Sequence, residues 1–476
     1  MKKFSSVFLS IIFVVSLTHA QFSEDALRYT SSSASLGARA FGMGGAFIGV
    51  ADDYTASFWN PAGLAQLRRL EVTGGISSIG IDNKAGFLGA SQTASTSSTG
   101  LNDIGYVFPF PTVQGSLVFS LGYNRRENFS SLMKFDGFNS QSSIIPTLYQ
   151  SDGDYDVPYN VYLENQNGYT PITRNVQQTG TVKESGALNE WAFAGAIDIA
   201  ENFSVGVSIN IITGAYKYVR NYLEADTKNF YVNTQSGLTA DSAYLRFNKF
   251  YYDNYLDADV NGSSFTFGLM YRSEVFRAGL IAKSPAVVSI KETYNDEGES
   301  VFDNTGTFSA LPKTTYTTPN STNTYGVTSP WTLGGGVSVY VLPFVLVSGD
   351  VEYSDWTQLE WTDNSDLEKT NTSLQSQLRP VTTFRFGTEI DIPSTDVRLR
   401  AGYAVKPSPY KGDPSSYDTQ IITGGAGILL QRNVLLDAAI GFGSWKTFRT
   451  NYGYNTSRTD ETLSTVQMNF TISYRF

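Results

Sequence analysis

The last fifteen residues of the chain, 462–476, alternate between polar and apolar side chains. One parity carries the apolar residues Val466, Met468, Phe470, Ile472, Tyr474 and Phe476. The other parity carries the polar residues Thr465, Gln467, Asn469, Thr471, Ser473 and Arg475. Because successive side chains of a β-strand point to opposite faces, the segment has one apolar and one polar face. This pattern, ending on an aromatic residue, is typical of the closing strand of an outer-membrane β-barrel, although a soluble β-sandwich can share it.

The composition of the chain favours the barrel. Glycine (43 residues), tyrosine (29) and phenylalanine (31) are abundant, while only 16% of the residues are charged. No segment beyond the first twenty residues approaches the ~20 consecutive apolar residues that a membrane helix needs. Such a chain suits a β-barrel whose aromatic side chains lie at the two membrane interfaces.

A signal peptide is expected at residues 1–20. Lys2 and Lys3 precede an apolar run at 7–17, and small residues lead to Ala20, after which cleavage is expected. The run is too short to cross a membrane as a helix. We therefore expect the mature protein in the outer membrane of a Gram-negative bacterium.

Residue usage disfavours several classes of function. The chain has no cysteine, and its one histidine, His19, lies in the expected signal peptide. Thiol catalysis, histidine-based triads and histidine metal sites are therefore excluded, and we expect no enzyme activity, no metal and no cofactor. The formal net charge of −10 disfavours nucleic acid as a partner.

Fourteen candidate strands follow residue 69. They cover approximately 70–80, 101–111, 115–126, 187–199, 203–220, 260–273, 275–293, 329–341, 344–357, 380–391, 396–406, 418–431, 434–448 and 461–476. Short turns alternate with long polar segments at 81–100, 127–186, 221–259, 294–328, 358–379, 407–417 and 449–460. This asymmetry predicts an all-β fold, a transmembrane antiparallel barrel over residues 70–476. It has short periplasmic turns and long extracellular loops. The start of its first strand and the end of its last strand both lie at the periplasmic side.

The segment before the first strand, residues 21–69, differs in character. Ser23 can begin a short helix, a glycine-rich stretch follows, and Asn60 is placed as an N-cap before Pro61. The segment is too polar and too broken to span the membrane. We expect it to lie inside the barrel as a small helical hatch.

These residues resemble a known family. The runs 37–47, 51–53 and 58–64 are similar to the N-terminal hatch of FadL-type outer-membrane transporters, whose hatch signature matches Asn60-Pro61-Ala62. The segments 349–356 and 386–403 resemble later strands of that family, so the resemblance covers 37–64 and 345–476. It implies passive uptake of long-chain fatty acids or aromatic hydrocarbons. Extracellular loops would capture the ligand, an apolar pocket would hold it, and hatch movement would open a lateral exit at a kinked strand.

Two groups of site residues follow from this interpretation. The predicted hatch and gating residues are Gly42, Gly44, Gly45, Asn60, Pro61 and Ala62. The predicted ligand-binding residues are Phe135, Phe138, Ile144, Ile145, Phe247 and Phe250, with Arg246, Lys249, Arg385 and Arg400 as headgroup contacts. The alternatives are a plain helix N-cap at Asn60, loops that pack on one another, and arginines that pair with wall acids such as Asp350 or Glu352, or with the hatch.

The leading functional interpretation is a channel for hydrophobic compounds, and two others stay open. A barrel similar to the shuttles of type IX secretion would bind protein signals, and a general porin would pass polar solutes. The expected partners are a hydrophobic small molecule such as a long-chain fatty acid, outer-membrane lipid and lipopolysaccharide. We expect a monomer. The loops 127–186 and 221–259 match nothing in the family, so they could bind either ligand or protein.

Overall fold

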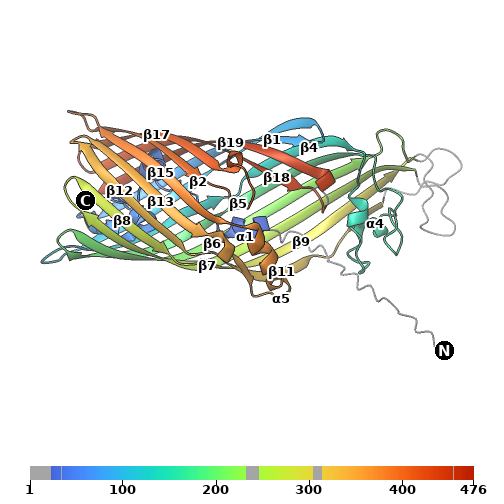
Figure 1. The fold of residues 1–476 in the computed structure, drawn as a ribbon, viewed down its shortest axis with the longest axis horizontal. Coiled ribbons are helices and arrows are strands. Elements are labelled where there is room, and N and C mark those ends of the chain that lie inside the picture. Colours follow the sequence, from blue (N-terminus) through green and yellow to red (C-terminus); the bar gives the residue numbers. More distant parts are fainter. Residues whose placement is uncertain (1–22, 34, 232–245, 304–313, 454) are drawn as a thin grey trace, which may run out of the picture.

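The protein is a closed, antiparallel β-barrel in the computed structural model, which describes residues 23–33, 35–231, 246–303, 314–453 and 455–476 (Figure 1). The expected signal peptide lies outside the described residues. One sheet contains all named strands, and β1 (Glu71–Phe87) closes it by pairing with both β2 (Ala90–Phe110) and β19 (Arg458–Arg475). The last strand therefore pairs with the first and closes the barrel.

The wall has fourteen strand positions, as predicted, because several of the nineteen named strands share one position. The shared positions are β3 (Leu117–Asn128) with β4 (Ser131–Asn139), β8 (Phe276–Lys283) with β9 (Val287–Phe302), β10 (Thr314–Thr317) with β11 (Ser321–Thr328) and β12 (Thr332–Leu342), and β13 (Val345–Asp355) with β14 (Glu360–Thr362). The others are β5 (Val176–Ala200), β6 (Phe203–Ala225), β7 (Phe247–Arg272), β15 (Pro380–Asp391), β16 (Val397–Lys406), β17 (Thr419–Leu430) and β18 (Val434–Thr450). Pro285 and Pro330 lie in two of the interruptions, where a residue without an N–H cannot donate to the ladder.

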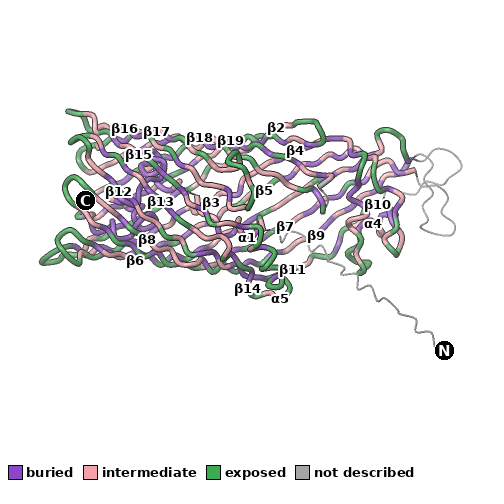
Figure 2. The backbone as a smooth tube through the Cα atoms, viewed as in Figure 1, coloured by how far each residue is buried: buried purple, intermediate pink, exposed green. Residues whose placement is uncertain are grey.

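The two faces of the wall follow the predicted alternation. On β19, Phe470 and Ile472 are exposed by 50% and 54%, while Asn469 and Ser473 are buried in the lumen. The same alternation of buried and exposed residues runs along the other strands (Figure 2). An apolar outer face and a polar inner face are what a barrel in a membrane requires.

One predicted boundary is wrong in a way that has a clear cause. Residues 81–100, expected as a long loop, continue β1 and β2 up to a two-residue turn at Leu88 and Gly89. Both turn residues have positive φ, 48° and 86°, as tight hairpins of this kind require. The segment is rich in serine and threonine, and strands that extend beyond the membrane can be polar on both faces. Polarity alone therefore does not separate a loop from a strand there. Likewise, β4 and the first part of β5 lie within the predicted loop 127–186.

The two ends of the barrel differ. Short turns and the C-terminal residue Phe476 lie at one end, which we call the hatch end (Figure 1). The hairpin at 88–89 and the longer connections lie at the other, which we call the loop end. The short helices of these connections are α4 (Val157–Asn160), α5 (Ser365–Glu368), α6 (Asn371–Gln377), η2 (Ile145–Thr147), η3 (Trp356–Gln358), η4 (Ser415–Tyr417) and η5 (Asn455–Ser457). Within the described ranges, no helix has the length and apolarity needed to cross a membrane.

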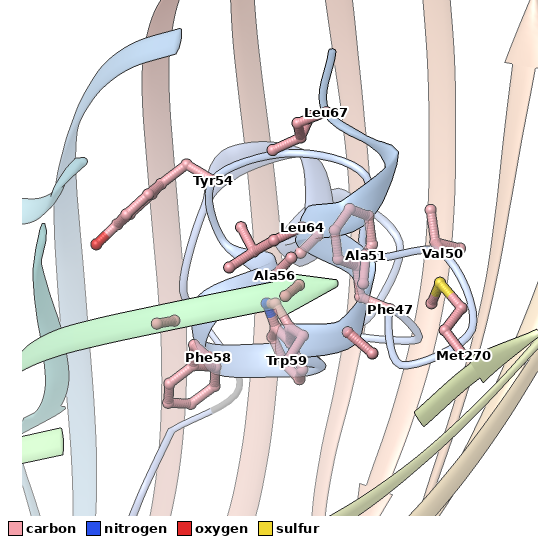
Figure 3. Close-up of a cluster of buried hydrophobic side chains, with 14 of the residues drawn as sticks. Phe47, Val50, Ala51, Tyr54, Ala56, Phe58, Trp59, Leu64, Leu67 and Met270 are labelled. Carbon is pink, nitrogen blue, oxygen red and sulfur yellow. The ribbon is translucent and has the colours of Figure 1, made fainter. Parts of the chain in front are cut away.

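The N-terminal segment lies inside the lumen, as predicted (Figure 1). It contains α1 (Ser23–Thr30) and a compact part, residues 37–66, that we call the hatch. The hatch comprises α2 (Ala38–Gly42), α3 (Ala56–Trp59) and the 3-10 helix η1 (Pro61–Gln66). Its apolar centre is buried, and Met270 of β7 reaches into it from the wall (Figure 3).

Candidate functional site

The hatch is seated on a belt of wall glycines. At each of these positions an added Cβ atom would come within 3.4 Å of a hatch atom. The belt comprises Gly105, Gly122, Gly206, Gly268, Gly279, Gly336, Gly387, Gly402, Gly425 and Gly441, on ten different strands. Because the wall has no side chains at these points, hatch atoms touch the wall backbone directly: main-chain atoms at most positions, and the side chains of Phe41, Tyr54 and Asn60 at the others. The belt thus gives part of the high glycine content a structural use.

The Asn60 side chain forms hydrogen bonds both within the hatch and to the barrel wall. Its side-chain oxygen accepts from the Ala62 N–H at 3.2 Å, which caps η1, and Pro61 occupies the first position of that helix. Its side-chain nitrogen donates to the carbonyl oxygens of Ile48 and Leu269, both at 3.1 Å. The N-cap interpretation of this triplet and the hatch interpretation are therefore both consistent with the contacts.

The predicted glycines of the hatch lie where its backbone meets β15, β16 and β17. Gly44 and Gly45 have φ of 66° and 74°, a conformation that glycine adopts without strain. The Thr423 hydroxyl donates to the Gly42 carbonyl oxygen at 3.1 Å and accepts from the Gly44 N–H at 3.0 Å. Asp350 of β13 similarly accepts from the N–H groups of Phe47 and Ile48, at 2.6 and 2.8 Å. The wall thus holds the hatch through its main chain.

An ion-pair network fastens the other side of the hatch. Arg39 donates to both carboxylate oxygens of Glu389, at 2.9 and 2.8 Å, and also pairs with Asp52. Arg400, one of the predicted headgroup contacts, pairs with Glu389 and Asp437, each at 2.6 Å. The two arginines share one wall carboxylate, so Arg400 holds the anchor of the hatch in this structure.

The two hatch carboxyl groups beside Arg39 differ in their acidity. Burial opposes ionisation of Asp52, but the guanidinium groups of Arg39 and Arg277 lower its pKa below the usual value. Burial raises the pKa of Asp53 to about 6, against the opposing effect of Arg39. The Thr55 N–H donates to the Asp53 carboxylate at 2.9 Å, which stabilises its charged form. Asp53 is therefore the hatch group whose charge changes in a mildly acidic medium.

A cavity of about 470 Å³ lies directly above the hatch, in the size range of small-molecule sites. Phe58 and Trp59 of α3 contribute aromatic surface from the hatch, and the last residue of α1, Thr30, and the next three residues, 31–33, also line the cavity. Charged side chains line the wall, namely Arg126, Lys283, Arg385 and Lys406 together with Glu127, Glu190 and Glu352. Four cations against three carboxylates leave an excess of positive charge. A second groove, of about 680 Å³, lies on the outer surface of β3 to β8 and belongs to the lipid-facing side.

Arg385 is one of the four cationic residues that line this cavity. It donates to Glu352 through Nη2 at 2.6 Å, while Lys283 donates to the other Glu352 oxygen at 2.9 Å. Its Nε and Nη1 atoms are buried and have no hydrogen-bond partner among the described residues. The guanidinium also lies 5.5 Å from the Trp59 ring centroid. Two free donors next to aromatic rings can bind a carboxylate whose apolar part lies on the rings.

The helix α1 lies in the lumen between this cavity and the loop end. Tyr29 packs edge-on against Phe129 and Tyr216, with ring centroids 6.4 and 5.9 Å away. Its hydroxyl donates to Glu292 at 3.3 Å, and Arg28 pairs with Glu184 at 3.2 Å. The helix is therefore held by the wall through both apolar and charged contacts.

Beside the cavity, the hydrogen-bond ladder between β2 and β3 is incomplete. Their ladder runs from Phe110 opposite Leu117 to Asp103 opposite Asn124 and ends there. The next residues of β3 form a bulge between Arg125 and Glu127 and pair with β5, as β4 does. Within the described ranges, β2 from Ala90 to Asn102 has ladder partners on β1 only. The cavity residues Arg126 and Glu127 lie at this break.

The predicted capture residues lie far from the cavity, at the loop end. Phe135, Ile144, Ile145, Phe247 and Phe250 belong to one buried cluster, which we call the loop-end cluster. Phe138 stacks on Phe230 with the Lys228 ammonium 3.4 Å from its ring centroid, and Arg246 and Lys249 are half-buried at the start of β7. Their part in ligand binding stays a prediction. Within the described part of the chain, Arg385 is the one predicted ligand-binding residue, out of ten, that lines the cavity above the hatch.

Several cavity residues were not among the predicted site residues, namely Trp59, Lys283, Trp356, Lys406 and Trp445. A signal for two of them was present. Lys283 and Lys406 share strand parity with the lumen-facing residues Ile281 and Ala404. A lysine on the lumen side of a barrel strand is therefore a reasonable candidate for ligand contact.

The fold is similar to those of solved channel structures. A FadL homologue of Pseudomonas aeruginosa matches with a TM-score of 0.56 and 12% identity over 93% of this chain and 98% of that one. The toluene transporter TodX of Pseudomonas putida matches with 0.54 and 13% over 89% and 94%. The monoaromatic hydrocarbon channel CymD matches with 0.51 and 14% over 93% and 97%. No family model matches the chain, and no curated protein matches it. The fold predicted from the resemblance, a barrel with an internal hatch, is confirmed.

Proposed function

We propose that this chain, which has the fold of the FadL-type transporters, is an outer-membrane channel for passive uptake of hydrophobic and amphipathic compounds. One observation carries the proposal: a lumen cavity of about 470 Å³ lies on the hatch and beside the point where the β2–β3 ladder ends. A ligand held there would have the hatch below it and the end of this ladder beside it.

The lining of the cavity favours an amphipathic anion. Aromatic side chains, chiefly Trp59, Trp356 and Trp445, supply surface for an apolar group, and Arg385 has free donors for a carboxylate. An apolar ligand gains roughly 0.8 kcal/mol for each buried methylene group, so capture needs no external energy. Long-chain fatty acids and aromatic carboxylates fit this chemistry.

We infer the route of the ligand from the positions of the hatch, α1 and the end of the β2–β3 ladder. The ligand enters from the loop end, which faces the outside of the cell, while the hatch end faces the periplasm. Displacement of α1 gives access to the cavity, and the ligand leaves sideways between β2 and β3. Hatch movement, rather than full release of the hatch, opens the last part of this path. A lateral exit spares an apolar molecule from transfer into water.

A filled lumen argues against a general porin, which needs an aqueous channel. A shuttle for protein signals would use the loop end and not the cavity. The proposed channel acts as a monomer, surrounded by outer-membrane lipid and lipopolysaccharide.

Transport by the purified mature protein in liposomes tests the proposal. We expect labelled oleate and a neutral aromatic hydrocarbon to accumulate faster than in empty liposomes, while a small sugar does not. Equal rates for the sugar and the hydrophobic probes would establish a porin instead. Rates equal to those of empty liposomes for both hydrophobic probes would reject the uptake function.

A further inference from the structure

A short linker between α1 and the hatch lies in the lumen against the break, the point where the β2–β3 ladder ends. We call residues 31–33 together with Ser35 the linker. Residues 31–33 line the cavity above the hatch. The linker also forms hydrogen bonds to both strands beside the break. It therefore lies between the cavity and the break.

On both strands the linker is bonded to a residue that the ladder passes over. The register between β1 and β2 omits Asn102, and the register between β3 and β5 omits Arg126. A residue omitted in this way forms a β-bulge, which re-aims its side chain. Asn102 and Asp103 are accordingly both buried, although neighbouring residues of a regular strand point to opposite faces. The two bulges adjoin the break from its two sides.

Hydrogen bonds reach the linker from each side of the break. From β3, the Arg126 carbonyl oxygen accepts from the Ser33 N–H at 2.9 Å, and the Arg126 Nε atom donates to the Ser31 carbonyl oxygen at 3.2 Å. From β2, the Asn102 side-chain nitrogen donates to the Ser35 carbonyl oxygen at 3.3 Å. The linker thus bridges the two strands where their own ladder has ended.

Neighbouring contacts fix the shape of this bridge. The hydroxyl groups of Ser33 and Ser35 form a hydrogen bond of 2.7 Å, and the Asn469 side chain of β19 donates to the Ser35 carbonyl oxygen at 2.5 Å. Glu190 of β5 pairs with Arg126 at 3.0 Å. These are a few polar contacts, whereas the hatch is seated on a belt of ten glycines. The linker can therefore move away from the break while the hatch stays on the wall.

We propose that the linker is the gate of the lateral exit, and that Asn102 and Arg126 are the positioning residues that hold it closed. When their bonds to the linker break, the linker leaves the break and the cavity becomes continuous with it. The inference rests on the proposed uptake function and deepens it by naming the segment that moves.

Hydrogen exchange of the mature protein in detergent tests the bridge without ligand or transport. The Ser33 amide should be protected in the wild type, because it donates to Arg126. Asn102→Ala removes the contact on the opposite strand, and the Ser33 amide should then exchange roughly 2- to 10-fold faster, the range expected for loss of one hydrogen bond. Asn102→Gln keeps an amide donor and should restore part of the protection. Asn202→Ala, in an exposed turn, is the control and should match the wild type. Equal exchange in Asn102→Ala and the wild type would overturn the proposal.

A reversible cross-link separates the gate from the uptake function. The chain has no cysteine, so Ser35→Cys/Asn102→Cys introduces two thiols at the bridge alone. Joining them with a short thiol-reactive linker that contains a disulfide should lower oleate uptake into liposomes at least tenfold, and reduction should restore it. Oleate binding in the cavity, measured by tryptophan quenching, should change less than twofold. Wild type treated with the same reagent is the control.

The outcomes of the cross-linking experiment are distinct. If the cross-linked protein takes up oleate as fast as its reduced form, the gate is overturned and the uptake function stands. If the wild type takes up no oleate, the uptake function itself fails, and an exit gate fails with it.

Discussion

The side-chain nitrogen of Asn60 donates a hydrogen bond to the main-chain carbonyl oxygen of Leu269, 3.1 Å away, and so ties the hatch to β7. Beside it, Gly268 leaves the space that the Asn60 side chain occupies. The same side chain caps η1 through its oxygen. One residue thus sets both the internal shape of the hatch and its position in the wall.

Asn60→Ala should loosen the hatch. Loss of the cap costs about 1 kcal/mol, and each buried carbonyl oxygen left without a donor costs ~1–3 kcal/mol. We expect raised ion conductance in planar bilayers. Asn60→Asp keeps the cap but loses the donors, so it should show part of the increase. Asn202→Ala, in an exposed turn, is the control. Unchanged conductance in both Asn60 variants would contradict the role of this contact.

Gly402→Ala should displace the hatch by direct overlap. A Cβ atom at Gly402 would collide with the Gly44 main chain, and overpacking of this kind costs about 1–3 kcal/mol. We expect a lower unfolding midpoint in denaturant and faster proteolysis of the hatch. At Gly424 the nearest heavy atom to an added Cβ, the Arg400 carbonyl oxygen, is 3.8 Å away. Gly424→Ala should therefore behave as wild type, and equal losses in both variants would reject the glycine belt.

Hatch seating should weaken as the pH rises from about 4 to about 6. Burial raises the pKa of Asp53 to about 6 in the seated hatch, above its value in water of about 3.9. The seated state therefore binds the proton more tightly. The stabilisation that the Asp53 proton gives to the seated hatch is complete below pH ~4 and is lost as the pH rises through about 6. Conductance should rise over this interval, and Asp53→Asn should flatten the rise. A pH profile of Asp53→Asn that matches the wild type would exclude this carboxyl as the cause.

Arg385→Gln should discriminate between anionic and neutral ligands. The free donors of Arg385 form charge-assisted hydrogen bonds worth about 1.5–3 kcal/mol, so affinity for a fatty acid should fall roughly 10- to 100-fold. Binding of a neutral aromatic hydrocarbon should change less than twofold. Arg398→Gln, at a half-exposed arginine paired with Asp391 at 2.9 Å, is the control. Equal loss for both ligands in tryptophan-quenching titrations would mean that Arg385 only maintains the cavity.

A bulky group at Gly100 should block the lateral exit. Gly100 lies on β2 opposite the break, where an added Cβ atom would lie 2.6 Å from the Arg125 Nη2 atom. The chain has no cysteine, so Gly100→Cys can be modified selectively with a large maleimide. We expect uptake of oleate into liposomes to fall at least tenfold after modification. Gly80→Cys, where the nearest atom to an added Cβ is 3.9 Å away, should retain uptake when modified in the same way. Full activity of modified Gly100→Cys would place the exit elsewhere.

Local patterns were sufficient for much of the architecture. The faces of the last strand, the number of wall positions and the N-cap at Asn60 follow from spacing along the chain. Strand parity and capping depend only on neighbouring residues. The same reasoning failed for 81–100, where serine and threonine suit both a loop and a strand outside the membrane.

Only the tertiary structure decided which residues meet. Arg385 and Arg400 have the same lumen-facing character in sequence, yet Arg385 lines the cavity while Arg400 anchors the hatch through Glu389. The loop-end phenylalanines pack on one another, and three tryptophans from distant parts of the chain line the cavity. Such contacts depend on the register and curvature of strands far apart in the chain. The alternating sequence thus determined a barrel with an internal hatch, and packing across the lumen determined where that barrel can hold a ligand.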